Sequence, residues 1–448
     1  VFEFFMPGPG PSSSHTTGPM RAAADFFKRL RSLDPAAAAT AERLELHFFG
    51  SLAATGKGHG SDRAAVAGLL GELPESCDIA LLRRVLTVEY PAVKIAFAGR
   101  ELAFDAGNIS WCFGAHDYPF QNTMRLRLLD RAGRELLDEV YYSIGGGFIR
   151  REGEAEPEHR IVPYRYRGMD SFKLLAMKYN VAPVAMLRAN ELATGLHASE
   201  AELDRKLDFL IDTMFAAVER GLGAEGVLPG PIGLSRRAGR VFERANRAGL
   251  RDRFMVLLDA FALAVAEENA AGSLVVTAPT SGSAGLLPGV MYLLSVECGM
   301  ARAKLRDGLM VAALIGMIAR ANASISGAEV GCQGEVGVAS AMAAALLSFV
   351  HGGSLAEIEC AAEIALEHHL GMTCDPIDGY VQIPCIERNA VGAVTAYNSY
   401  LLASVSDPAK QKVSFDEVVA AMLQTGRMMP SGFKETSQGG LAVCSLCR

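Results

Sequence analysis

The stretch Ile325-Ser-Gly-Ala-Glu-Val-Gly-Cys-Gln-Gly-Glu-Val-Gly-Val-Ala339 places Cys332 among four glycines. Two further cysteines stand in turn-rich contexts, Cys374 in Gly371-Met-Thr-Cys-Asp-Pro376 and Cys385 in Gln382-Ile-Pro-Cys-Ile-Glu-Arg-Asn389. A structural cysteine is usually a small apolar residue on a helix face, whereas Gly, Pro and Asp neighbours favour a bent backbone that directs a thiolate. We therefore expect a metal site at Cys332, Cys374 and Cys385, with buried structural cysteines as the alternative.

The composition restricts the class of protein. The chain has 448 residues, of which 50% are hydrophobic and 21% charged, which predicts two or three globular domains. The net charge of −7 and the lack of a Lys/Arg block argue against binding to nucleic acid or an anionic membrane. Nine cysteines, an odd number in a long chain, favour a reducing cytoplasm over a secreted disulfide framework. We expect a cytoplasmic protein with a small-molecule partner.

Two uncharged stretches, 269–296 and 336–350, are long enough to require a test for membrane insertion. Prolines and glycines interrupt the first, and the second offers fewer than the roughly 20 residues that a spanning helix needs. Both are expected to be buried inside the protein rather than in a membrane.

Residues 1 to about 20 are predicted to form a loop that carries Ser12-Ser-Ser-His15. These hydroxyls either cap the following helix or, with His15, bind a polar substrate. Residues 40–75 are predicted to be helical at first and to break at Gly50–Gly60. This places His59 in a glycine-rich loop, where a neutral imidazole can act as a base or can simply lie on the surface.

The pattern changes to alternation between Leu86 and Phe148. Met124, Leu126 and Leu128 alternate with arginines, and a turn at Arg131–Arg134 leads into Val140-Tyr-Tyr142, which together predict a hairpin. The glycines of Ser143-Ile-Gly-Gly-Gly-Phe148 favour a tight turn or an anion-binding nest.

The rest of the chain is predicted to be mostly helical, after a charged, proline-containing linker at 151–168. The expected fold is multidomain α+β, with an N-terminal α+β domain (1–150) built on an antiparallel sheet and a C-terminal, mostly all-α catalytic domain (169–448). The expected helices are 201–220, 253–269, 301–323, 338–350 and 354–369.

The loop Thr277-Ala-Pro-Thr-Ser-Gly-Ser-Ala-Gly285 combines hydroxyls and glycines before a helix. Its side-chain donors and backbone N–H groups suit a carboxylate, and the helix start adds a positive dipole end. A simple connecting turn explains the glycines but explains the many hydroxyls less well. We expect Thr280, Ser281, Gly282 and Ser283 to bind substrate.

Taken together, these segments resemble the single-chain bacterial iron–sulfur L-serine dehydratases. The matching segments run from Gly10-Pro-Ser-Ser-Ser-His-Thr-Thr-Gly-Pro-Met20 to Ser437-Gln-Gly-Gly-Leu-Ala-Val443, nearly the whole chain. The steps of 42 and 11 residues between the cysteines match the family's cluster ligands. The resemblance implies a [4Fe–4S] cluster held by Cys332, Cys374 and Cys385, a cytoplasmic homodimer, and an N-terminal domain similar to a separate beta chain.

The resemblance also implies a chemistry. Three thiolates leave one iron open as a Lewis acid, which can stabilise the β-hydroxyl of L-serine as a leaving group while a base removes the α-proton. His59 is the first candidate for the base and His15 the second, with Lys57 and Glu335 as competitors. The products are pyruvate and ammonia.

Substrate orientation is expected from Ser13 and Asn122. The family usually has His-Pro-Asn-Gly-Met around this asparagine, whereas this chain has Phe120-Gln-Asn-Thr-Met124. That departure leaves open a related lyase that acts on another β-substituted amino acid.

Two other classes also remain open. A pyridoxal-phosphate dehydratase would use Gly145–Gly147 as a phosphate cradle, but no lysine lies near the cysteine loops in the sequence. The other class, a non-enzymatic iron–sulfur protein, would need a fourth firm ligand. Zinc with three cysteines is a further possibility for the metal, although the Cys-x-x-Cys pairs usual for structural zinc are absent around these residues.

The chain ends in Gly439-Gly-Leu-Ala-Val-Cys-Ser-Leu-Cys-Arg448. Two glycines allow this tail to fold back, so Cys447, or failing that Cys444, is a candidate fourth ligand that caps the open iron. A frayed end with incidental thiols is the alternative.

Overall fold

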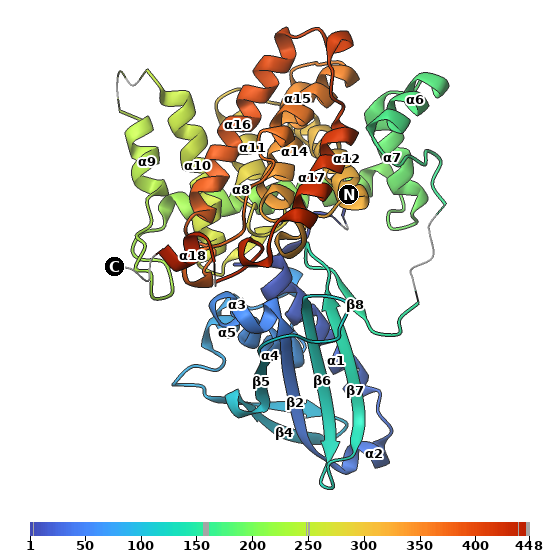
Figure 1. The fold of residues 1–448 in the computed structure, drawn as a ribbon, viewed down its shortest axis with the longest axis vertical. Coiled ribbons are helices and arrows are strands. Elements are labelled where there is room, and N and C mark those ends of the chain that lie inside the picture. Colours follow the sequence, from blue (N-terminus) through green and yellow to red (C-terminus); the bar gives the residue numbers. More distant parts are fainter. Residues whose placement is uncertain (3, 156–160, 248, 250, 438, 445–448) are drawn as a thin grey trace.

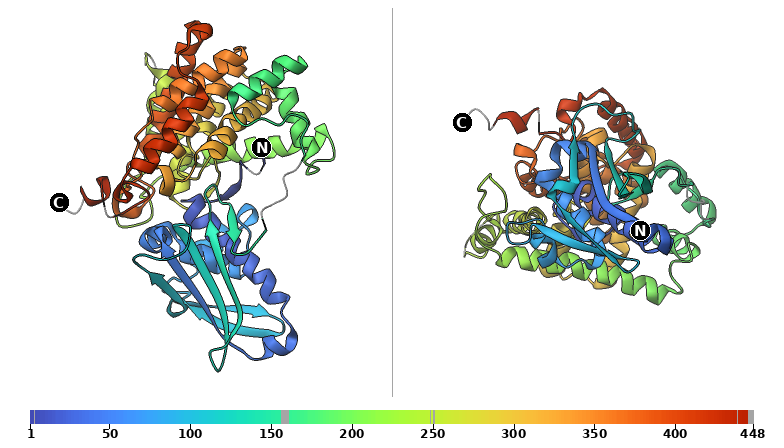
Figure 2. Two further views of the ribbon diagram at one scale, coloured as in Figure 1. Left: turned by 45° about the vertical axis from the view of Figure 1, so that its right-hand side comes forward. Right: turned by 90° about the horizontal axis from the view of Figure 1, so that it is seen from below.

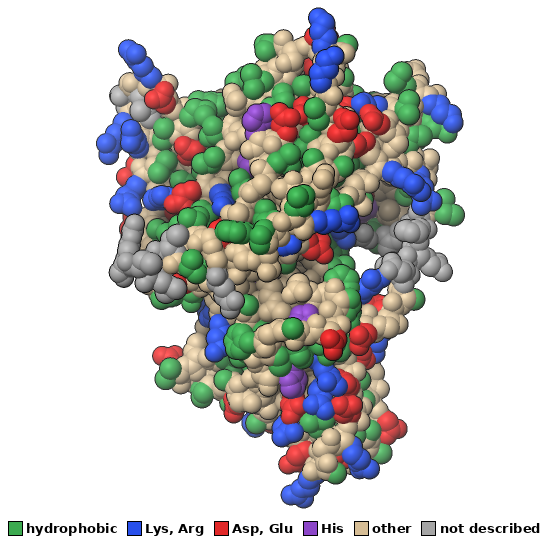
Figure 3. Space-filling view, in the orientation of Figure 1, with side chains coloured by type: hydrophobic (Ala, Val, Ile, Leu, Met, Phe, Trp, Pro, Cys, Tyr) green, Lys and Arg blue, Asp and Glu red, His purple; other side chains and the backbone are tan. Residues whose placement is uncertain are grey.

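The computed structural model describes all residues of the chain except 3, 156–160, 248, 250, 438 and 445–448. It divides into a sheet region, which contains most of residues 1–150, and a larger helical region (Figure 1, Figure 2). The α+β class and the mostly helical C-terminal part are confirmed. Acidic and basic side chains are interspersed over the face of both regions shown in Figure 3.

The sheet region is built on five strands in the order β5-β2-β6-β7-β8. Strands β6 and β7 form the predicted hairpin. Three glycines with positive φ, Gly145–Gly147, form the next turn, from β7 to β8. The β2–β5 pair is parallel and the other pairs are antiparallel, so the sheet is mixed. The strands are β2 (Ala41–Gly50), β5 (Ile109–Cys112), β6 (Asn122–Asp130), β7 (Glu135–Ser143) and β8 (Ile149–Arg151).

One face of this sheet is covered by helix α1 (Gly18–Arg31), which packs against α4 (Ser61–Leu69) (Figure 1). Phe26 and Leu30 of α1 join Phe48 of β2 in one apolar core. A separate ribbon of β3 (Ala92–Phe97) and β4 (Arg100–Asp105) adds Ile95, Phe97, Leu102 and Phe104 to the same core. The remaining short helices here are α2 (Pro35–Ala39) and α5 (Ile79–Arg84).

The prediction for residues 40–60 was wrong in two respects. Residues 41–50 form strand β2, because buried Leu44, Leu46 and Phe48 alternate with polar residues at period two. The glycine-rich segment that follows forms helix α3 (Ser51–His59), which ends at Gly60 in the left-handed conformation (φ 66°). His59 therefore lies in the last turn of a helix and is buried, not in a surface loop.

The N-terminal loop also contains more regular structure than predicted. Strand β1 (Pro7–Pro9) pairs with β9 (Leu274–Val276), and Ser13–Thr17 form a π-helical turn. Phe4 and Phe5 are buried in the core of the helical region. Val1, Phe4, Phe5 and strand β1 thus pack with the helical region, although the next segment enters the sheet region.

The five helices expected in the helical region are confirmed. The helices observed are α6 (Met169–Tyr179), α7 (Pro183–Ala193), α8 (Glu200–Gly223), α9 (Ala238–Ala245), α10 (Arg253–Ala270), α11 (Leu286–Val296), α12 (Arg302–Asn322), α13 (Gly327–Val330), α14 (Val338–Val350), α15 (Leu355–Glu367), α16 (Cys385–Val405), α17 (Phe415–Met428) and α18 (Leu441–Cys444).

Helix α14 lies at the centre of this region, in contact with α11, α12, α15 and α16. One stretch, Gln333–Val350, is long and apolar enough to cross a membrane, and 89% of it is buried inside the protein. Its apolar character is explained by burial on all sides, as expected for the core helix of a helical bundle.

Small residues allow some of these helices to approach closely. A Cβ added at Gly221 of α8 would lie 2.2 Å from the carbonyl oxygen of Ala264 on α10. A Cβ at Gly289 of α11 would lie within 3.1 Å of three atoms of Ala262, also on α10. The backbones of these helices therefore meet at positions where only glycine fits.

Gly221→Ala should lower the free energy of unfolding by about 1–3 kcal/mol, because the added methyl group forces α8 and α10 apart. Urea unfolding followed by circular dichroism measures this change. Gly223→Ala is the matched control, since a Cβ there meets nothing within 4 Å, and the better helix former should leave stability unchanged or raise it by up to about 1 kcal/mol. Equal unfolding midpoints for the two variants would contradict the close approach.

Candidate functional site

Three cysteines from separate elements line one cavity. Cys332 immediately precedes a π-helical turn (Gln333–Gly337), Cys374 lies in the loop after α15, and Cys385 is the first residue of α16. All three side chains are buried. The structure thus brings the three predicted metal ligands together at one cavity.

Glu335 supplies a further donor in the same cavity. Its Oε2 lies 3.7 Å from the Cys332 sulfur and 3.8 Å from the Cys374 sulfur. The ligand atoms of Cys332, Glu335 and Cys374 all lie within 4.8 Å of one another, which is close enough to hold a metal ion. Gly327 leaves the necessary space, because a Cβ there would lie 2.7 Å from that carboxylate oxygen and 3.1 Å from the Cys374 sulfur.

The side chain of Gln333 fixes the two cysteine loops to each other. Its Nε2 donates to the carbonyl oxygens of Val330 (2.8 Å) and Met422 (3.3 Å), and its Oε1 accepts from the N–H of Gly371 (3.0 Å). Because this amide is fully buried, its hydrogen bonds are a strong positional constraint on Cys332 and Cys374.

The backbone of Cys374 is held on its other side by residues 433–436. The Cys374 N–H donates to the Phe433 carbonyl (2.8 Å), and its carbonyl accepts from the Thr436 N–H (3.1 Å). Between these two bonds stands Glu435, a non-glycine residue with a positive φ of 46°. Such a conformation costs on the order of 1–3 kcal/mol and persists only where neighbouring contacts impose it.

The electrostatics of the cavity favour neutral thiols at Cys374 and Cys385. A hydrogen bond with Cys332, followed by burial, raises the pKa of Cys374, and burial with the nearby Cys332 raises that of Cys385. Burial alone would lower the pKa of the Arg388 guanidinium, but the three cysteines raise it. The nearly buried Arg388 guanidinium can thus balance the negative charge of thiolates. The three cysteines together with this cation fit a metal group bound by thiolates.

His15 is engaged at both ring nitrogens. Its Nδ1 lies 3.1 Å from Glu435 Oε1 and 2.9 Å from the Ser14 hydroxyl, and its Nε2 lies 3.1 Å from the Ser51 hydroxyl. Burial alone would lower the pKa of His15, but the Glu435 carboxylate raises it above its ordinary value. Burial likewise opposes ionisation of Glu435, and its pKa is nevertheless lowered by His15. The two side chains therefore form a buried ion pair.

His59 stacks beside His15, with ring centroids 4.6 Å apart. Its Nδ1 lies 2.9 Å from the Thr55 carbonyl oxygen, which can only accept, so Nδ1 carries the proton and Nε2 keeps its lone pair. Burial, with the charge of His15, lowers the pKa of His59 to about 4. His59 is therefore neutral near pH 7, and it lines the cavity of the three cysteines.

The predicted substrate loop adjoins this cavity. Gly282 lines it, and the Thr280 hydroxyl donates to Glu335 Oε1 at 2.7 Å. The Ser13 hydroxyl accepts from the Ser281 N–H at 3.4 Å, so the N-terminal serines and this loop are in contact.

Two other predicted substrate residues are bonded differently. The Ser283 hydroxyl donates to the Ala278 carbonyl (3.1 Å) and is fully buried within its own loop. Asn122 begins β6 opposite Gly50, next to Ser51, and its side-chain oxygen has no hydrogen-bond partner among the described residues. Asn122 is not among the residues that line the cysteine cavity.

The C-terminal segment folds back toward the cysteine loop. Leu441 donates its N–H to Asp375 Oδ2 (2.9 Å), and α18 packs against residues 377–379. Cys447, the predicted fourth ligand, lies outside the described residues, and the side chain of Cys444 is not described either.

Sequence reasoning missed Glu435 and Arg388. Glu435 stands in Lys434-Glu-Thr436, which has no spacing or glycine pattern that marks a site. Arg388 follows Cys385 by one helical turn, and this i, i+3 spacing is the only local signal that could have placed it beside the cysteines.

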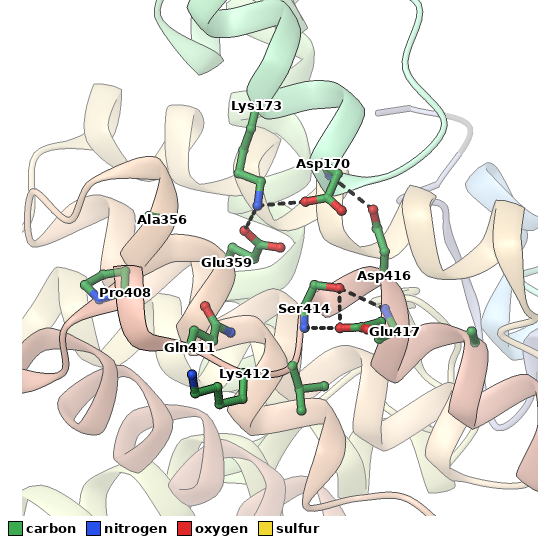
Figure 4. A pocket seen from close by; sticks show the side chains of 12 residues that line it. Asp170, Lys173, Ala356, Glu359, Pro408, Gln411, Lys412, Ser414, Asp416 and Glu417 are labelled. Atoms are coloured by element: carbon green, nitrogen blue, oxygen red, sulfur yellow. Dashed lines mark hydrogen bonds and ion pairs between the residues drawn. The ribbon is translucent and has the colours of Figure 1, made fainter.

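A larger hollow of about 570 Å³ lies elsewhere, between α6, α15 and α17 (Figure 4). Lys173 pairs there with Asp170 (2.9 Å) and Glu359 (2.5 Å), and Asp416 accepts from two N–H groups at the start of α6. These charges satisfy one another and join three helices, so we assign this hollow a structural role.

Comparison with known proteins gives a family match over nearly the whole chain. Residues 1–154 match the model for the serine dehydratase beta chain, and residues 151–442 match that for the serine dehydratase alpha chain. The chain is 42% identical to an L-serine dehydratase of Streptomyces coelicolor, over 99% of this chain and 98% of that one. It is 41% identical to L-serine dehydratase 2 of Escherichia coli (99% and 98%) and 40% identical to an L-serine dehydratase of Haemophilus influenzae (100% and 99%).

The His15–Glu435 pair gives a pH-dependent prediction. Because the pKa of His15 is raised, its interactions stabilise the fold below its ordinary pKa of 6.5, and this stabilisation is lost as pH rises. Because the pKa of Glu435 is lowered, its interactions stabilise the fold above its ordinary pKa of 4.5, and this stabilisation is lost as pH falls. The difference in free energy of unfolding between the wild type and Glu435→Gln should therefore be largest between about pH 5 and 6.5. Glu75→Gln, which removes a half-exposed partner of Arg21, should show no such window. A difference that is independent of pH would contradict the ion pair.

Proposed function

The chain belongs to the serine dehydratase family, with the beta-chain and alpha-chain regions fused in one polypeptide, and from this premise we propose that it is an iron–sulfur-dependent L-serine dehydratase. It would convert L-serine to pyruvate and ammonia by loss of the α-proton and the β-hydroxyl. The observation that carries the proposal is the convergence of three buried thiols on one cavity that a neutral histidine also lines.

Cys332, Cys374 and Cys385 would hold a [4Fe–4S] cluster. When bound, such a cluster with three protein thiolates supplies an open iron as a Lewis acid for the hydroxyl group that leaves. Arg388 would balance the negative charge of the thiolates, and the Gln333 amide would keep two of them in place.

His59 would take the α-proton at Nε2. Its other nitrogen is fixed by the Thr55 carbonyl, and its lowered pKa keeps Nε2 free of a proton near pH 7. His15 is a poorer candidate, because its two nitrogens are occupied and its pKa is raised. Lys57 is exposed above the ring of Trp111.

The substrate would be positioned by residues around the cavity. Backbone and hydroxyl groups of the 277–285 loop face Glu335 on one side and the N-terminal serines on the other. The altered residues around Asn122 keep a related β-substituted amino acid as an alternative substrate. The proposed substrate contacts are Ser13, Asn122, Thr280, Ser281, Gly282 and Ser283.

We further propose two domains, 1–150 and 169–448, in a cytoplasmic homodimer. The two family matches meet at residues 151–154, which supports the proposed boundary. Val391, Leu402 and Val405 of α16 are 61%, 47% and 83% exposed, so one side of this helix offers apolar surface to a second copy.

Cys332→Ala, Cys374→Ala and Cys385→Ala should each remove bound iron and dehydratase activity while the helical region stays folded. Anaerobic absorption spectra with iron and sulfide analysis measure the loss, and they also separate a cluster from a zinc site. Cys360→Ala is the control, because Cys360 is buried on α15 and does not line the cavity. Full iron content in one of the three variants would remove that cysteine from the ligand set.

His59→Ala should slow exchange of the α-hydrogen of L-serine with deuterated solvent by roughly two to four orders of magnitude, with iron content unchanged. His47→Ala, on β2 beside Glu45, should leave exchange as in wild type. If exchange persists at the wild-type rate without the His59 imidazole, the base is another group.

A further inference from the structure

A second cavity, of about 340 Å³, adjoins the cysteine cavity. Pro11, His59 and Val381 line both, so the His59 ring lies at the boundary between them. The second cavity is bounded by the end of α3, the start of α4 and the 380–382 loop. A molecule that spans the two cavities would contact His59.

The two cavities carry opposite charge. Lys57, Arg63 and Arg83 line the outer cavity, and none of its lining residues is acidic. Glu335 and Glu435 line the inner one. The outer cavity is therefore lined by cations and the inner one by two carboxyl groups, of which Glu435 is paired with His15.

The Arg63 side chain lies beside the residue that follows His59. An ideal Cβ on Gly60, the next residue after His59, would lie 3.3 Å from Arg63 Nη2, so the guanidinium folds over this glycine. Lys57 and Arg63 form no ion pair with a carboxylate of the described residues, whereas Arg83 donates to Ala271 and Ser273. The planar guanidinium is suited to bind a carboxylate through two hydrogen bonds.

The hydroxyl loop is less ready to take a carboxylate. The Thr280 hydroxyl already donates to Glu335, and the Ser283 hydroxyl donates to a carbonyl oxygen. A carboxylate placed there would also lie beside Glu335 and be repelled by it.

From this polarity we infer that Arg63, assisted by Lys57 and Arg83, forms a carboxylate-binding site on the outer side of His59. An amino acid would bind across the boundary, with its carboxylate on Arg63 and its ammonium toward Glu335 and Glu435, so that its α-carbon faces His59. The inference rests on the proposed function and specifies the binding mode of its substrate.

The test compares two probes that each carry one half of the zwitterion. L-lactate has the carboxylate without the ammonium, and ethanolamine has the ammonium without the carboxylate. Calorimetric titration of the cluster-loaded enzyme should show that Arg63→Ala weakens L-lactate binding about tenfold or more, the usual loss for a charge-assisted pair. Ethanolamine should bind as well as before or better, and Arg63→Lys should recover part of the lactate affinity.

Kinetics supply the second readout. Arg63→Ala should raise KM for L-serine about tenfold or more and change kcat much less, with iron content unchanged. Lys28→Ala removes an exposed cation of α1 that lines neither cavity and should change none of these constants. If Arg63→Ala does not fold, Lys57→Ala provides the same comparison.

Unchanged lactate affinity in Arg63→Ala would overturn this inference, as would equal weakening of lactate and ethanolamine. Neither result touches the proposed function, which stands or falls on whether the wild-type enzyme deaminates L-serine. Should the wild type fail to do so while lactate binding still depends on Arg63, the carboxylate site stands and the substrate is a different amino acid.

Discussion

The pair of backbone hydrogen bonds that clasps Cys374 is the constraint on which the rest of the site depends. Phe433 and Thr436 hold the peptide of this cysteine from both sides, and the residue between them, Glu435, is thereby forced into a left-handed conformation and directed at His15. A single local arrangement thus fixes the position of the Cys374 thiol and the charge state of the histidine pair. The neutral state of His59 near pH 7 follows, because burial, together with the adjacent His15 charge, keeps the pKa of His59 low.

Much of the fold could be predicted from sequence because burial leaves a periodic signal. Helices such as α12 and α14 are apolar over whole turns, and Met124, Leu126 and Leu128 of β6 alternate with arginines before the turn to β7. The failure at β2 has a physical cause: a proline and four alanines precede it in a short helix and mask an alternation only a few residues long. Two glycines, Gly56 and Gly58, likewise concealed α3, whose conformation is imposed by tertiary packing rather than by propensity.

The candidate site divides in the same way. The cysteines could be found because glycine and proline mark the bent backbone around them. Glu435 could not be found, because its partners Ser14 and His15 lie more than 400 residues away in the chain. Arg63 had a charge but no motif. The inferred carboxylate-binding role of Arg63 depends on the folded structure, in which His59 lines both a cavity with cationic residues and a cavity with carboxyl groups.

The pairing of β1 with β9 has a consequence for how the two regions stay together. The chain starts inside the helical core at Phe4 and Phe5, leaves it to build the sheet, and returns only after residue 151. The sheet region is therefore attached to the helical region at both of its ends, by the continuing chain at one end and by the buried N-terminal residues at the other. If the polypeptide were cut between its beta-chain-like and alpha-chain-like parts, the buried N-terminal residues would still hold the two pieces together. The histidines would then remain beside the cysteines without a peptide bond between the two parts.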